Sequence, residues 1–131
     1  MKKIIVTLIT LFALSAFAQT AETVEKAPLN YLKALQSSND AVVSSAIFYV
    51  VKLQMFYPET RDYRITGQLI TLANKSKNEA IRNQAELALK YIQYPELMKQ
   101  LEKKDYKDGA AFFALLSEKM PANPAEFVAA R

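Results

Sequence analysis

The sequence of 131 residues contains no cysteine and no histidine, and it has only two glycines. The missing cysteines exclude disulfide bonds and thiol nucleophiles. The missing histidines remove the commonest metal ligand and the commonest general base near neutral pH. Gly67 and Gly109 stand too far apart for a glycine-rich phosphate loop, and no serine occurs in a nucleophile-elbow or Ser-x-x-Lys pattern. We therefore expect no enzyme activity, no cofactor and no metal site.

Closely spaced carboxylates are the remaining candidates for catalysis. Asp105 and Asp108 stand three residues apart at a predicted turn. Asp108 also stands at the expected start of a helix, where an aspartate side chain accepts hydrogen bonds from the first free N–H groups. We favour this capping role. A carboxylate-dependent hydrolase therefore ranks third, behind the two binding functions given at the end of this subsection.

Residues 1–18 have the three parts of a signal peptide. Two lysines precede an uncharged stretch from Ile4 to Phe17, and a small-x-small pattern then ends at Ala18. The apolar run is shorter than the ~20 residues that a membrane-spanning helix needs. We expect cleavage after Ala18 and a periplasmic or secreted protein.

Cleavage would leave 113 residues, enough for one small domain, and would lower the net charge from +4 to +2. We therefore expect no nucleic-acid partner. The expected parts are a polar leader at 19–27, a helical domain at 28–120 and a C-terminal tail at 121–131. Four lysines around residues 99–107 form a basic patch, but acids are interspersed among them. This pattern favours a solvated helix face, with attraction to a membrane surface of anionic lipids or to an acidic partner as the weaker alternative.

The tripeptide Tyr-Pro-Glu occurs twice, at 57–59 and at 94–96. The residue before proline is pushed out of helical geometry, so each tyrosine should end a helix. Proline suits the first position of the next helix, and glutamate suits its first turn because the helix dipole favours an acid there. The repeated tripeptide therefore predicts two equivalent junctions between helices and needs no ligand to explain it.

Further pairs of residues repeat at nearly the same spacing. Leu32 and Leu69 are 37 residues apart, as are the two tyrosines of the tripeptides, and Asn39-Asp40-Ala41 recurs as Asn78-Glu79-Ala80 after 39 residues. An acid is followed six positions later by alanine in each of three corresponding pairs, Asp40/Ala46, Glu79/Ala85 and Asp108/Ala114. A period of 20 to 50 residues is typical of stacked helical arrays.

The segment at 78–89, NEAIRNQAELAL, resembles the second helix of a HEAT or HEAT-like repeat through Ile81, Arg82 and Ala85. The segment at 39–50 matches less fully, with Val43 where arginine is usual. The third segment, at 107–118, keeps only the acid and the alanine. The resemblance implies an all-α fold, a short α–α superhelix of three helical hairpins. It also implies a protein-binding role. The helices are expected near 28–37, 40–56, 60–75, 79–94, 95–104 and 108–120.

The predicted helix at 40–56 is apolar nearly all round. Arg82, Glu86 and Lys90 should form a charged, solvent-facing stripe on the helix at 79–94. The equivalent residues 39 positions earlier are aliphatic: Val43, Ile47 and Val51.

We expect something to cover this aliphatic stripe, since a helix that is apolar all round is normally buried. The cover is either the chain's own leader near Val24 or tail at Phe127 and Val128, or else a second copy or another protein. The candidate interaction surface consists of Val43, Ile47, Val51, Tyr49 and Tyr91. The favoured function is an exported, non-enzymatic protein-binding module. The alternative is a carrier for a small apolar or lipid-like ligand.

Overall fold

The computed structural model describes residues 24–120, and every regular element in that range is helical. This confirms the all-α prediction. The elements are a helical segment at 24–35, α2 (Asp40–Phe56), the 3-10 helix η1 (Pro58–Thr60), α3 (Tyr63–Lys75), α4 (Glu79–Gln93), α5 (Pro95–Gln100) and α6 (Gly109–Lys119). Within residues 24–120, no helix has the length and apolar character needed to cross a membrane.

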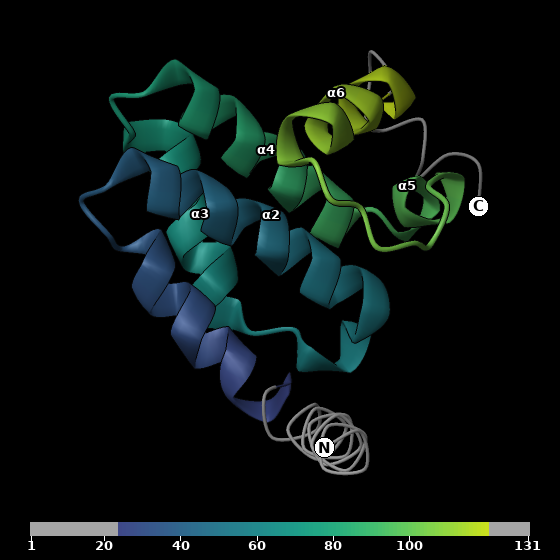
Figure 1. The fold of residues 1–131 in the computed structure, drawn as a ribbon, viewed down its shortest axis with the longest axis horizontal. Helices are drawn as coiled ribbons and strands as arrows, with labels where there is room; N and C mark the ends of the chain where they lie inside the picture. The colour runs from purple at the N-terminus through teal and green to yellow at the C-terminus, as the bar shows by residue number, and fades with distance from the viewer. Residues whose placement is uncertain (1–23, 121–131) are drawn as a thin grey trace, which may run out of the picture.

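Helix α2 occupies the middle of the molecule (Figure 1). The helical segment at 24–35 meets it through the turn at 36–39, and the two diverge from that turn. On its other sides α2 packs against α4 and contacts α6 through aromatic rings. Helix α3 packs against α4. The core is one cluster of buried side chains that spans all of these helices.

The turns that start α2 and α4 have the same local structure. Asn39 and Asn78 each accept hydrogen bonds from two backbone N–H groups of the helix that follows, at 2.9 and 3.4 Å in both cases. Ser37 and Ser76 in turn accept from the N–H of these asparagines, at 3.1 and 3.2 Å. An N-terminal cap satisfies N–H groups that have no partner inside the helix. The repeated sequence therefore encodes a repeated helix start.

Two side-chain contacts hold these helix starts side by side. Asn78 Nδ2 donates to Asp40 at 3.2 Å, and Ser44 Oγ donates to Gln84 Oε1 at 2.8 Å. Both bonds join the N-terminal halves of α2 and α4, so the two helices run in the same direction. This is the relation expected of the second helices of successive hairpins.

The two Tyr-Pro-Glu junctions behave as predicted. Tyr57 and Tyr94 end α2 and α4, and their N–H groups donate to the carbonyls of Leu53 and Lys90 at 2.8 and 3.0 Å. A new helical element begins at the proline in each case. Asp108 caps α6 by accepting from the N–H of Ala111 at 3.1 Å, as predicted.

Three predicted boundaries are wrong. The helix expected at 60–75 is split, because Asp62 caps a new helix from Tyr63 after the 3-10 turn of η1. The helix expected at 95–104 ends at Gln100. Helical structure already includes residues 24–27, which were expected to belong to a polar leader.

The third repeat-like segment, at 107–118, differs from those at 39–50 and 78–89. Ala46 and Ala85 are buried where α2 and α4 approach each other, as expected of small residues. Ala114, which has the matching place in the sequence of α6, is exposed. The buried face of α6 instead carries Phe112, Phe113 and Leu116. The acid-to-alanine spacing thus correctly predicts a buried alanine in the first two segments and wrongly predicts one in the third.

Candidate functional site

Four of the five residues predicted to form an interaction surface lie in the core. Val43, Ile47 and Val51 are 3%, 0% and 0% exposed, and Tyr91 is 1% exposed. Burial raises the pKa of the Tyr91 phenol to about 12. The prediction of an accessible stripe is corrected here, because these side chains cannot touch a partner in the folded protein. Only Tyr49, at 47%, is on the surface.

The chain's own helices cover the aliphatic stripe of α2. Helix α4 packs against α2, and Ile81 and Ala85 of α4 belong to the same core cluster as Ile47. Val24, one predicted cover, instead lies near the exposed Tyr49, and Phe127 and Val128 lie outside the described residues. The stripe on α2 is aliphatic and its counterpart on α4 is charged, because α2 is central in the fold whereas the α4 stripe is only partly covered. There Lys90 pairs with Glu86 at 2.9 Å.

The exposed side of α2 forms a groove with the helical segment at 24–35. We call it the tyrosine groove, and its volume is about 230 Å³. Two of its rings belong to Tyr49 and Phe56 of α2, a third belongs to Tyr57 directly after that helix, and the fourth comes from the facing segment. The lining residues are Val24, Ala27, Tyr31, Tyr49, Lys52, Leu53, Phe56 and Tyr57.

Tyr31 and Tyr49 form one wall of the groove. Their ring centroids are 6.1 Å apart and the rings are nearly parallel, at 12°. Burial, and to a smaller extent the neighbouring Tyr49, raises the pKa of Tyr31 above its ordinary value of 10.0, so its phenol is protonated at neutral pH. Within residues 24–120 the hydroxyls of these two tyrosines make no hydrogen bond to another group. Both are therefore available as donors.

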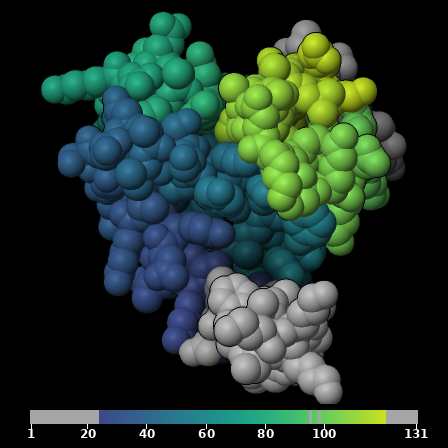
Figure 2. All heavy atoms as spheres, in the orientation of Figure 1, coloured from purple at the N-terminus to yellow at the C-terminus, as the bar shows by residue number. Residues whose placement is uncertain are grey.

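Lysines lie along the other edge of the groove. Lys52 Nζ is 5.3 and 5.5 Å from the ring centroids of Phe48 and Tyr49, and Lys103 Nζ is 5.7 Å from that of Phe56. These distances are typical of cation–π contacts. Lys103 comes from the segment at 101–108, which lies against α2 (Figure 2).

Asp105 fixes this segment to α2. Its carboxylate forms ion pairs with Lys52 and Lys107. Hydrogen bonds from Lys107 and then Lys52 lower the pKa of Asp105 to about 2, so it is ionised at any physiological pH. Lys103, by contrast, has no carboxylate partner within residues 24–120. The groove therefore has an uncompensated positive charge beside Phe56.

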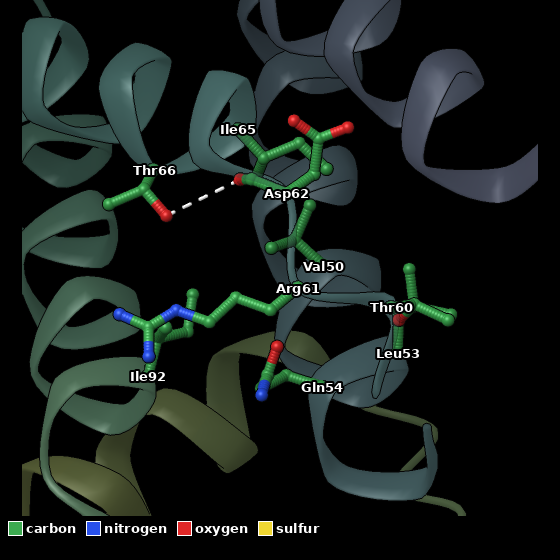
Figure 3. Close-up of a pocket in the computed structure, with 9 residues that line it drawn as sticks. All are labelled: Val50, Leu53, Gln54, Thr60, Arg61, Asp62, Ile65, Thr66 and Ile92. Atoms are coloured by element: carbon green, nitrogen blue, oxygen red, sulfur yellow. Dashed lines mark hydrogen bonds between the residues drawn. The ribbon is translucent and has the colours of Figure 1, made fainter. Parts of the chain in front are cut away.

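A second hollow lies beside Gln54, is lined partly by the exposed Arg61, and has a volume of only about 10 Å³. In the view of Figure 3 the Arg61 side chain extends between Thr66 and Gln54. Thr66 Oγ1 donates to the Asp62 carbonyl at 3.4 Å. Gln54 Nε2 donates to the Pro58 carbonyl at 3.5 Å. Such a volume holds about one water molecule. These residues join η1 to α2 and leave no room for a ligand.

The described residues bring no candidate catalytic or metal-binding group together. Asp105 and Asp108 have the roles of ion pairing and helix capping. No cluster of three or more acids that could hold a metal ion occurs within residues 24–120. What the groove offers chemically is aromatic surface, hydroxyl donors and positive charge.

Sequence reasoning missed Tyr31, Lys52 and Phe56 as groove residues, although a signal for α2 was present. Val42, Tyr49 and Phe56 are spaced seven residues apart, so they lie on one helix face two turns from each other. That face is opposite the buried aliphatic stripe. Tyr31 had no comparable signal, since its contact with Tyr49 depends on how the hairpin closes.

Comparison of this chain with protein-family models, with curated proteins and with solved structures gave no match.

Proposed function

We propose that this protein is an exported, non-enzymatic binding module that holds a segment of a protein partner in the tyrosine groove. The observation that carries the proposal is the half-exposed Tyr49, which lies in an open groove with Tyr31, Phe56 and Tyr57. Aromatic residues are enriched at the centres of protein interfaces because each provides a large contact area with few rotatable bonds.

The size of the groove favours a segment of protein over an enclosed small molecule. Sites for small ligands usually have volumes of about 300 to 1,000 Å³ and enclose most of the ligand surface. The groove has about 230 Å³, and Tyr49 in its wall is half exposed. It therefore suits a few side chains of a chain that runs across the surface. This is the reason for preferring a protein partner to a lipid-like ligand.

Export and a HEAT-like architecture are parts of the same proposal. The leader pattern at 1–18 supports export to the periplasm or beyond. The matching caps of α2 and α4 and their parallel arrangement support stacked HEAT-like hairpins. Short helical arrays present grooves between helices as binding surfaces. The absence of histidine and cysteine supports a binding role without catalysis.

Photo-crosslinking in the native cell envelope tests the proposal. A photoreactive benzophenone amino acid replaces Tyr49 in one variant and Tyr63 in a control variant. Tyr63 is an equally aromatic site on α3, 84% exposed and outside the groove. We expect an adduct with a protein at position 49 and none at position 63. Adducts at position 63 alone, at neither position, or with lipid alone at position 49 would overturn the proposal.

A further inference from the structure

We propose that the occupant of the tyrosine groove is residues 121–126 of a second copy of this chain, Pro-Ala-Asn-Pro-Ala-Glu. This inference rests on the proposed function and names the partner of the same site. Residues 121–126 have three features that the groove calls for: two prolines spaced three apart, small residues between or beside them, and an acid after the second proline.

The spacing of the groove rings matches the pitch of a polyproline II helix. Tyr49 and Phe56 are seven residues apart on one face of α2, which places them about 10.5 Å apart along the helix axis. A polyproline II helix advances about 9.3 Å per turn of three residues. Pro121 and Pro124 are separated by one such turn. Each proline can therefore meet one aromatic ring, as in other aromatic grooves that bind proline-rich segments.

The polar groups of the groove also suit a polyproline II segment. Such a segment has no internal hydrogen bonds, so its carbonyl groups need donors. The hydroxyls of Tyr31 and Tyr49 are available for this, as described above. A bound α-helix would satisfy its own carbonyls, and a bound strand would need a sheet edge, which residues 24–120 do not contain.

Charge sets the direction of the segment. Lys103 lies beside Phe56 and has no carboxylate partner within residues 24–120. If Pro124 meets Phe56, Glu126 follows at the same end of the groove and can pair with Lys103. The acid and the lysine thus lie together in only one of the two possible directions.

The arrangement of the helices favours a second copy over the same chain. Residue 121 follows α6, which lies on the side of α2 away from the helical segment at 24–35 (Figure 1). A contact between the groove of one copy and residues 121–126 of the next is not self-complementary. It therefore joins copies head to tail, in rings or in chains.

Light scattering of the purified exported protein over a range of concentrations measures this contact. We expect concentration-dependent self-association that Tyr49→Ala weakens by about tenfold or more, because truncation removes a central aromatic anchor. Tyr63→Ala is the matched control and should have no effect. Replacing Pro121 and Pro124 together by Ala should abolish association, whereas Asn123→Ala should not. Circular dichroism verifies that each variant keeps its helical content.

An exchange of the charges at Lys103 and Glu126 is the most specific test of the contact. Lys103→Glu and Glu126→Lys should each weaken self-association, and the double variant should restore it. Lys99→Glu, a charge reversal at the end of α5 away from the groove lining, should have no effect.

A monomer at every concentration would refute the inference, as would association that the proline variants leave unchanged. If the groove holds residues 121–126 of the same chain, the protein stays monomeric, which is the first of these refuting results. If the Tyr49 crosslinker still captures another protein in these cases, the proposed function stands without the inference. If it captures nothing, both fail.

Discussion

Introducing a carboxylate at Ile47 or at Val42 should have opposite effects on the stability of the protein. Both residues belong to α2. Ile47 is 0% exposed in the core, whereas Val42 is 41% exposed in the first turn. Comparing the two substitutions therefore distinguishes the buried side of α2 from its exposed side, since the introduced group is the same. It also tests whether the chain itself covers the aliphatic stripe.

The expected cost at Ile47 follows from its burial. Replacing the side chain by glutamate loses about 1.5–3 kcal/mol of hydrophobic burial. Leaving a carboxylate buried without a partner adds several kcal/mol more. The total of roughly 5 kcal/mol or more is comparable with the whole stability of a small domain. At Val42 a glutamate would stand near the positive end of the helix dipole, which stabilises by about 0.3–1 kcal/mol.

The stability of these variants is measured by thermal unfolding, which is monitored by circular dichroism. Ile47→Glu should lower the melting temperature by about 20 °C or more, or abolish the cooperative transition, at about 4–8 °C per kcal/mol for a domain of this size. Ile47→Val, which removes one methylene, should cost only about 0.5–1.5 kcal/mol. Val42→Glu should melt at or slightly above the wild-type temperature. An Ile47→Glu variant that melts like wild type and only loses a partner would refute the assignment of Ile47 to the core.

Three further predictions concern stability. Gly67 lies inside α3 with open space around the position of a Cβ atom, so Gly67→Ala should stabilise the protein by about 0.5–1 kcal/mol in a urea denaturation curve. Unchanged or lower stability would contradict this. Asn78→Ala removes the cap of α4 and its bond to α2, and should cost about 0.5–2 kcal/mol in the same measurement. A loss no larger than that of Lys77→Ala, the exposed neighbour, would count against it. The lowered pKa of Asp105 means that its ion pairs stabilise the fold fully above pH 3.8 and are lost as the pH falls towards 2. Asp105→Asn should therefore melt at a lower temperature than wild type at neutral pH, and the difference should vanish near pH 2.

The sequence predicted the helices well because their ends are determined locally. Asn39, Asn78 and Asp108 are capping residues, and each tyrosine that precedes a proline stops a helix. Such signals act within a few residues and need no knowledge of the tertiary fold. The split before α3 was missed because Asp62 was not recognised as a second cap four residues after Pro58.

The interaction surface was predicted poorly because burial depends on the whole fold. The matching residues of the two repeated segments correctly predicted where α2 and α4 begin and end. They do not determine which neighbouring helices cover each of them. Ile47 is central and buried, whereas Glu86, its counterpart in α4, is exposed. On a helix that is apolar on both sides, the sequence alone does not tell the core side from the surface side. Tyr49 was the exception, and it lies on the open side.

Two-dimensional NMR of the purified protein, at a concentration low enough for it to be monomeric and titrated with the peptide PANPAEFV, tests the tyrosine groove as the binding site most directly. We expect shifts of the resonances of Tyr31, Tyr49 and Phe56, and no shift at Tyr63 on α3. Tyr49→Ala should remove the response. Shifts confined to the α3 face, or a spectrum that does not change up to saturating peptide, would contradict the tyrosine groove as the binding site.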